Sequence, residues 1–349
     1  MVDDDKASLK QLALGIVRAQ TNVYIKELLR DNGVRIGATK DDFERNMLEA
    51  IEDGNLTKVQ LESWLNAVEG WGQQHVYAYR LPPAIKRTFE AAGKAEAAIK
   101  DAGLGAHWGG STTSQVEWPE DQELHLAAIT YDGSLRFHWH KGTKYWIRTK
   151  GEEQYDKDPE WIDGFEYQFR AFRGRSVREV MRFEIRPQDD MAALFIPKAI
   201  NSPEHQAAIA TAKEVVGHVL DYSTLERQHL LVGRIIRNFD QALTFGSSDV
   251  KASPQVSRLR SGAAYVEFGA TSTNGSYFDS SDVKVVREVI RSEKDVSAFD
   301  GTSGTFRFTD LGRVELAASD DRIRLWSSLT ADSVWWILRT LRDFEHDRA

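Results

Sequence analysis

The stretch RVELAASDDRIRLW, residues 313–326, repeats the pattern of RFEIRPQDDMAALF at residues 182–195, 131 positions earlier. Each copy reads arginine, apolar, glutamate, apolar, three spacer residues, Asp-Asp and a second alternating run. This order is typical of two antiparallel strands around a polar turn. A predicted helix follows each copy, so we expect two copies of one α+β unit, each with a sheet of about five strands and a helix lying across it.

The match extends upstream at the same offset. Residues 134–140 (SLRFHWH) align with residues 265–271 (YVEFGAT), and this places Leu135 with Val266 and Phe137 with Phe268. We therefore expect these two segments to form equivalent strands.

Length and composition set limits on the function. The chain has 349 residues, a 41% share of hydrophobic residues and a net charge of -8, which disfavours phosphate binding by the whole surface. It has no cysteine, which excludes disulfides and thiolate metal sites. The first twenty residues lack the pattern of a signal peptide, and no uncharged run approaches the roughly 18 residues that span a bilayer. We expect a soluble protein that is cytoplasmic, or nuclear in a eukaryote.

The residues before the first repeat predict a compact helical domain that ends at Pro82. Apolar residues recur at helical spacing over 8–20, and Thr39 and Thr57 each stand where a helix cap is expected. Residues 75–81 alternate, which fits a strand or an extended exit from this domain. The expected division is 1–83 helical domain, 84–114 connecting helix and loop, 115–222 first repeat, 223–253 bridging helix and linker, and 254–349 second repeat.

Within the first repeat, Asp132-Gly133 predicts a hairpin turn between two strands. Residues 151–163 are rich in acids and contain Pro159, so we expect an exposed acidic loop there. Single helices are expected over 84–104 and 225–245. The predicted strands of this repeat are 123–131, 134–140, 143–149, about 165–172 and about 177–186.

Few residues suggest catalysis. His138 and His140 share one face of a predicted strand and could hold a metal with His125, although such a pair more often forms a half-buried polar stripe. The pairs Asp189-Asp190 and Asp320-Asp321 fall at the predicted turns, where carboxylates accept hydrogen bonds from nearby backbone donors. The sequence has neither a phosphate loop with a Walker lysine nor a Gly-x-Ser-x-Gly elbow. We predict no enzymatic activity, no metal site and no cofactor.

The segment from Tyr167 to Arg186 is strongly basic. Six arginines stand against Glu179 and Glu184, interleaved with aromatic residues, for a local net charge of +4. Guanidinium groups at this density suit phosphate contacts, and an Arg-Gly-Arg turn at a sheet edge could reach a nucleic-acid backbone. The alternative is that these arginines pair with the neighbouring acids of 151–166. The candidate nucleic-acid contacts in this segment are Arg170, Arg173, Arg175, Arg178 and Arg182.

Two resemblances concern the helical domain. Residues 23–43 are similar to the helix-loop-helix of SAP DNA-binding motifs through Leu28, Gly33, Gly37, Lys40 and Phe43. A longer resemblance covers residues 9–81: a helix, YIKELL, a basic loop, the helical run 40–51, EDGNLT, the run 59–65 and HVYAY follow in order. This order resembles the N-terminal pyrin-like domain of the centromere protein N family.

The family resemblance carries expectations about fold and function. Members follow the helical domain with a TATA-binding-protein-like region, and this fits the repeat described above. The resemblance implies a death-fold or pyrin-like domain plus two TATA-binding-protein-like, or helix-grip, units. It also implies recognition of DNA on a nucleosome and pairing of the C-terminal part with a sister protein. By position, the DNA contacts of the helical domain would be Lys26, Arg30, Arg35, Lys40 and Arg45.

Three hypotheses follow. The favoured one is a non-enzymatic nucleic-acid-binding protein or DNA-associated adaptor, with double-stranded DNA as the expected ligand and a protein partner or second copy at a sheet edge. The second is a protein–protein adaptor with an exposed Trp64 or Trp71, in which the arginines pair internally. The third is a metal-dependent enzyme using His138 and His140. No arginine-rich segment precedes the second copy of the repeat, so we expect the ligand-binding surface to lie on the first repeat.

Overall fold

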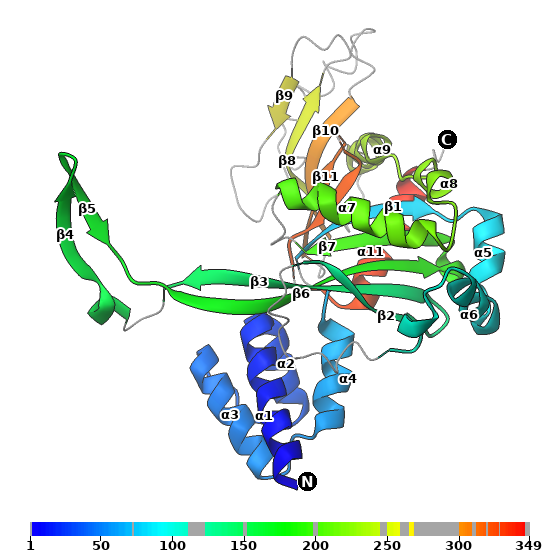
Figure 1. The fold of residues 1–349 in the computed structure, drawn as a ribbon. Helices are drawn as coiled ribbons and strands as arrows, with labels where there is room; N and C mark the ends of the chain where they lie inside the picture. Colours follow the sequence, from blue (N-terminus) through cyan, green and yellow to red (C-terminus); the bar gives the residue numbers. More distant parts are fainter. Residues whose placement is uncertain are drawn as a thin grey trace.

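The computed structural model describes residues 2–71, 73–110, 123–148, 152–197, 202–244, 250–258, 265–268, 300–308, 312–318, 320–327 and 329–345. Over these residues the chain forms a mixed α+β structure built on a ten-stranded antiparallel sheet. A unit of four helices lies below the sheet in Figure 1, and a long two-stranded arm leaves it to the left. None of the helices in the described ranges combines the length and the apolar character that crossing a bilayer requires.

The four-helix unit has an apolar core of its own. Its two predicted caps are present as capping boxes. Thr39 and Thr57 accept from the backbone N–H groups of Asp42 and Gln60, whose side chains accept from the cap backbone. The first helix begins at Val2 rather than at residue 8. The helices are α1 (Val2–Ala19), α2 (Asn22–Asp31), α3 (Lys40–Glu52) and α4 (Lys58–Val68).

Strand β1 (Gln74–Arg80) joins the two halves of the sheet. It pairs antiparallel with β7 on one side and with β12 on the other, and these are the last strands of the two repeats. Residues 75–80 of the predicted run are therefore part of the sheet, and the helical unit ends before β1 rather than at residue 83. The first half holds β2 (His125–Tyr131), β3 (Leu135–Ile147), β6 (Arg173–Arg186) and β7 (Met191–Pro197). The second half holds β8 (Val250–Arg258), β9 (Tyr265–Phe268), β10 (Asp300–Phe308), β11 (Gly312–Ala317) and β12 (Arg322–Leu325).

The two repeated stretches occupy equivalent places in the two halves. Each forms a pair of antiparallel strands, β6–β7 or β11–β12, next to β1. Asp190 and Asp321, which are 131 positions apart, both adopt a left-handed backbone conformation, with φ of 53° and 48°. The repeat therefore extends to the backbone geometry of the turn.

The upstream extension of the repeat is wrong. Strand β3 lies next to β6, whereas β9, its expected counterpart, lies at the far edge of the sheet next to β8. The neighbour of β11 is β10, so β10 takes the place of β3. In chain order β10 lies between β9 and β11, whereas β3 pairs with β6 directly and the strands between those two form a separate sheet, so the constant offset does not hold upstream of the repeat. Residues 269–271 of the predicted match lie outside the described residues.

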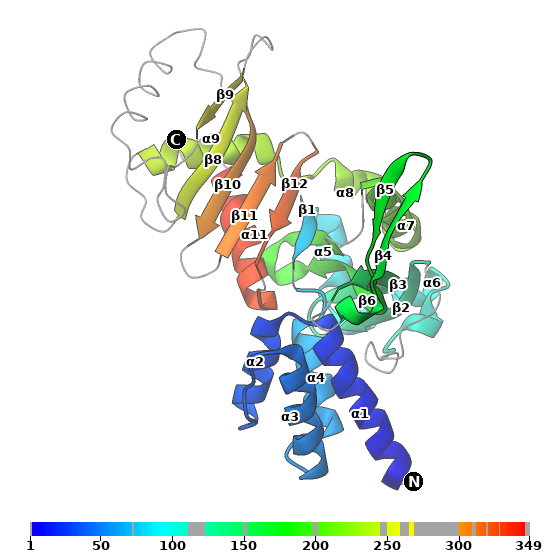
Figure 2. The same cartoon turned by 90° about the vertical axis from the view of Figure 1, so that its left-hand side faces the viewer.

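The two halves of the sheet are covered by helices on opposite faces. Tyr77 and Tyr79 of β1 belong to the core between the first half and helices α5 to α8. Val76 and Ala78 belong to the core between the second half and helices α9 and α11, which lie behind β8 and β10–β12 in Figure 2. Alternation along β1 thus supplies both cores. These helices are α5 (Pro83–Phe89), α6 (Ala92–Asp101), α7 (Ser202–Gly217), α8 (Tyr222–Glu226), α9 (Val232–Thr244) and α11 (Ala331–Glu345).

Two helices that the sequence predicts as continuous are each divided. The run 84–104 is split into α5 and α6 at Ala91, whose backbone is extended. The run 225–245 is split into α8 and α9, because the chain between them pairs with β1: His229 bridges Tyr79, and the Leu230 N–H donates to the Ala78 carbonyl over 2.9 Å. The predicted boundaries at 222 and 253 consequently fall inside α8 and β8, and the one at 114 lies outside the described residues.

The segment between β3 and β6 differs most from the prediction. Strand β3 is one strand of 13 residues instead of two. The expected acidic loop contains β4 (Lys157–Ile162), which pairs with β5 (Phe165–Phe169) in a separate two-stranded sheet. Asp163 and Gly164 form the turn with φ of 51° and 83°, the positive values that a two-residue hairpin loop requires. Together with the outer ends of β3 and β6, this hairpin makes the projecting arm of Figure 1.

Candidate nucleic-acid interface

The arm consists of two parts with opposite charge. We call residues 143–148 and 170–177 the stem and residues 152–169 the tip. The stem contains five basic residues and no acid, whereas the tip contains seven acids and one lysine. The two stem segments are neighbouring strands over most of their length, since Thr143 pairs with Val177 and Ile147 with Arg173. The stem is therefore a basic two-stranded ribbon in a chain whose net charge is -8.

A lysine and an aromatic ring lie together on one face of the stem. The Lys144 ammonium group lies 4.8 Å from the ring centre of Trp146, which is 64% exposed. Trp146 is opposite Gly174 on β6, where a Cβ atom would come within 2.7 Å of the Lys144 Cε atom. Because Gly174 has no side chain, the Lys144 side chain can lie directly over it. Phe172 is a second exposed aromatic residue of the stem.

The connection between stem and tip is fixed by one carboxylate. Asp156 accepts two hydrogen bonds from the Arg148 guanidinium group, over 3.1 and 2.6 Å, and a third from the Ala171 N–H over 2.8 Å. These bonds, that from Arg148 foremost, lower the pKa of Asp156, so it remains a carboxylate at neutral pH. Arg148 therefore serves the shape of the arm rather than a ligand.

Arg170 and Arg173, two of the candidate nucleic-acid contacts, are exposed at the stem. The Arg170 side chain donates to the Gln168 side chain over 3.2 and 2.9 Å, which holds it along the outside of the arm. Arg175 lies between them and the body on β6, and its side chain lies outside the described residues.

Arg178 and Arg182 are buried, so the prediction that they contact a nucleic acid at the surface is wrong. Arg178 pairs with the Glu69 carboxylate. Arg182 donates to the Glu69 backbone carbonyl over 2.6 Å and stacks 3.9 Å from the ring centre of Trp71. Burial lowers the pKa of Arg182 to about 10, which leaves it charged at neutral pH. Both arginines share the face of β6 that receives the four-helix unit, so they attach that unit to the sheet.

Internal pairing of the arginines therefore occurs, but mostly with other partners than the alternative proposed. Arg178 pairs with Glu69 instead of an acid from residues 151–166, and Arg186 pairs with Glu184 and Asp189. Trp71 is buried against Phe195, so it is not the exposed docking residue of the adaptor hypothesis.

The bases predicted in the helical unit divide into two sets. Lys40 donates to the Val17 and Gln20 carbonyls over 2.7 and 3.0 Å and so closes the C-terminal end of α1. Arg45 pairs with Asp42 over 2.7 Å. Arg45 also lies in an open surface hollow whose lining includes five acids, and their negative charge repels phosphate. The acids are Asp41, Glu44, Glu49, Glu52 and Asp53. The second set forms a separate group on α2 and the loop after it, with exposed Arg30 and Arg35 and a partly exposed Lys26.

The two histidines of β3 lie inside the structure. The His138 Nε2 atom is 3.0 Å from the Thr130 hydroxyl, and the His140 ring is fully buried with its centre 6.2 Å from that of His125. Burial, aided by Arg182 for His138 and Arg178 for His140, lowers both pKa values, that of His140 to about 3. Among the described residues, no group of three histidines or carboxylates is placed to hold a metal ion.

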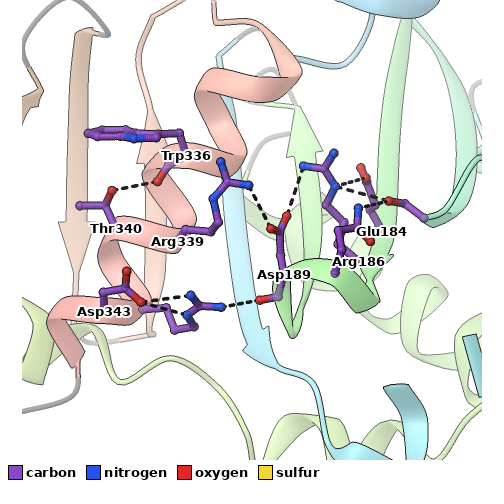
Figure 3. Close-up of polar contacts among 10 residues, drawn as sticks. Glu184, Arg186, Asp189, Trp336, Arg339, Thr340 and Asp343 are labelled. Atoms are coloured by element: carbon purple, nitrogen blue, oxygen red, sulfur yellow. Dashed lines mark hydrogen bonds and ion pairs between the residues drawn. The ribbon is translucent and has the colours of Figure 1, made fainter. Parts of the chain in front are cut away.

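The paired aspartates link structural elements. The Asp189 carboxylate pairs with Arg339 of α11 over 3.0 Å and with Arg186 over 3.4 Å (Figure 3). Its backbone carbonyl accepts a hydrogen bond from Arg342. Asp321 in the second repeat accepts from the first backbone N–H of α9 over 3.0 Å. These contacts differ from the prediction of nearby backbone donors, because Asp189 pairs with arginine side chains and Asp321 accepts from a backbone N–H that is 89 positions away.

Sequence reasoning missed Lys144 and Trp146, although a signal was present. Lys144, Trp146 and Arg148 alternate at every second position of a predicted strand, which places them on one face. Asp163-Gly164, flanked by aromatic residues, is likewise a hairpin signal inside the expected loop.

No family model matches this chain, and none of the curated proteins matches its sequence. We therefore base the assignment of this surface on its geometry and charge.

Proposed function

We propose that the protein is a non-enzymatic nucleic-acid-binding protein or DNA-associated adaptor that holds phosphate groups with the stem of its arm. The observation that carries the proposal is the stem itself, a projecting ribbon with five bases, no acid and an exposed tryptophan. Basic side chains on a nucleic acid release counterions from its phosphates, which favours binding at low salt.

The shape of the stem suits a nucleic-acid ligand. A two-stranded ribbon fits the major groove of double-stranded DNA, and side chains along it meet successive phosphates. Exposed Trp146 and Phe172 offer flat rings that can stack on sugars or bases. The residues that we propose as contacts are Lys144, Arg170, Arg173 and, by its position on β6, Arg175.

Lys26, Arg30 and Arg35 supply a second contact group on the helical unit. A four-helix unit followed by a pseudo-repeated sheet is also the order that the resemblance to the centromere protein N family implies. This resemblance supports a pyrin-like helical unit, a TATA-binding-protein-like sheet region and double-stranded DNA as the ligand.

The protein–protein adaptor function is favoured by a different part of the arm. The tip exposes Trp161, Phe165 and Tyr167, and its acids repel phosphate. Large exposed apolar side chains that gather on one projection mark a contact with another protein. Stem and tip can therefore serve a nucleic acid and a protein, respectively.

Fluorescence anisotropy with labelled double-stranded DNA, repeated with single-stranded RNA, tests the proposal over a series of salt concentrations. We expect the Lys144→Ala/Arg173→Ala variant to bind more weakly, with a salt slope reduced by up to about 2 because two phosphate contacts are lost. The matched control is Lys94→Ala/Lys100→Ala on α6, which also removes two exposed bases. Wild-type protein that binds neither ligand at low salt, or equal losses in the two variants, would contradict the proposal.

A further inference from the structure

We infer that the tip of the arm docks on the stem of a second copy of this chain, so that two arms pair in antiparallel orientation. The first observation is that the tip exposes aromatic residues. Trp161 is 73% exposed and Phe165 is 68% exposed, and every described residue of β4 is exposed. A lone two-stranded hairpin is marginally stable at best in water. A contact that covers these rings would stabilise it.

The second observation is that the arm is electrostatically complementary to itself. Its stem has a formal charge of +5 and its tip, with seven acids and one lysine, of -6. Within one chain the hairpin extends away from the stem in Figure 1, and Asp156 of the tip pairs with Arg148 of the stem. Two arms side by side with opposite directions place each tip on the other stem. Both contacts are then the same, as in any two-fold dimer.

The dimensions and the apolar residues of the two parts also match. Strand β4 and the stem segment 143–148 each have six residues, which is about 20 Å at roughly 3.3 Å per residue. Phe165 and Tyr167, which share one face of the tip, and Trp146 and Phe172 of the other stem provide exposed rings on both sides of the contact. A second copy therefore satisfies charge, length and apolar surface together.

Self-association through the arm has a consequence for ligand binding. The partner's tip would cover the same bases that we propose for phosphate, so a nucleic acid and the second copy compete for the stem. This competition rests on the proposed function, whereas self-association does not. The acidic tip then acts as a mimic of a phosphate backbone that the ligand displaces.

Two charge-reversal variants of the full chain test the inference. The tip variant is Glu160→Lys/Glu166→Lys, and the stem variant is Lys144→Glu/Arg173→Glu; all four residues are exposed. Sedimentation equilibrium should show that the wild-type chain is a dimer at low salt and dissociates as salt rises. Each variant alone should dimerise more weakly than the wild-type chain, because the reversals reduce the tip charge from -6 to -2 or the stem charge from +5 to +1. An equimolar mixture of the two should dimerise more tightly than either variant alone, since one contact of the mixed dimer joins an unchanged tip to an unchanged stem.

A monomeric wild-type chain at low salt, or a mixture that stays monomeric, would overturn the inference. Single variants that both dimerise as tightly as the wild-type chain would also overturn it. Circular dichroism and thermal unfolding confirm that each variant folds, and Phe165→Ala, which changes no charge, should weaken the dimer as well.

DNA binding separates this inference from the proposed function. The tip variant should bind double-stranded DNA at least as tightly as the wild-type chain, because it keeps the stem and lacks the competitor. If the stem binds DNA but the mixed dimer does not form, the inference fails and the proposed function stands. If the mixed dimer forms but no nucleic acid binds, the proposed function fails and the inference stands.

Discussion

Replacing Arg182 by alanine should unfold or undock the four-helix unit without affecting the ligand surface. Arg182 is buried, donates a charged hydrogen bond to the Glu69 carbonyl over 2.6 Å and stacks on Trp71. A hydrogen bond from a charged donor contributes about 1.5–3 kcal/mol, and a desolvated cation–π contact contributes about 2 kcal/mol. We therefore expect the free energy of unfolding to fall by about 3–5 kcal/mol, because both contacts are lost together.

Arg173 provides the matched comparison, since it is exposed on the same strand. Arg173→Ala should change the free energy of unfolding by less than about 0.5 kcal/mol, and it should lower the salt slope of DNA binding by about 0.9. Urea unfolding followed by tryptophan fluorescence measures the first quantity, and anisotropy at several salt concentrations measures the second. The reasoning is refuted if Arg182→Ala keeps full stability yet weakens DNA binding.

Three further predictions concern other parts of the structure. Gly70→Ala should destabilise the protein more than Gly33→Ala, as urea unfolding can measure. Both glycines have positive φ, but a Cβ atom at Gly70 would lie 2.3 Å from the Arg182 side chain, whereas a Cβ atom at Gly33 would have no heavy atom within 4 Å. Burial lowers the pKa of His140 from 6.5 to about 3 in the folded chain, so below pH 6.5 the unfolded chain binds a proton that the folded chain does not. The free energy of unfolding should therefore fall by about 1.4 kcal/mol for each pH unit below 6.5. His140→Gln should remove that slope between pH 7 and 5.5, and an unchanged slope would exclude His140 as its source. Asp156→Asn should speed proteolysis between stem and tip, and equal cleavage rates would show that this carboxylate does not fix the arm.

The sequence pattern predicts the parts of the fold that depend on neighbouring residues. The capping boxes at Thr39 and Thr57 and the turns at Asp190 and Asp321 follow from local hydrogen bonding, and all four are present. The place of β1 does not follow, because its partners β7 and β12 come more than 100 residues later in the chain. Alternation identifies a strand but does not say which strands flank it.

The candidate site was predictable in the same partial way. The arginine-rich segment reads as one patch, yet Arg178 and Arg182 are buried while Arg173 is exposed. The difference arises because the four-helix unit covers the inner half of β6 and not the outer half. That contact joins Glu69 to residues 109 and 113 positions later, a pairing that periodicity does not reveal.

Binding of a nucleic acid by the stem is tested most directly by hydrogen–deuterium exchange with and without double-stranded DNA. We predict that DNA slows exchange in peptides that cover residues 143–148 and 170–177, and that peptides from α6 do not change. Protection confined to the four-helix unit, or no protection anywhere at saturating DNA in low salt, would contradict the account.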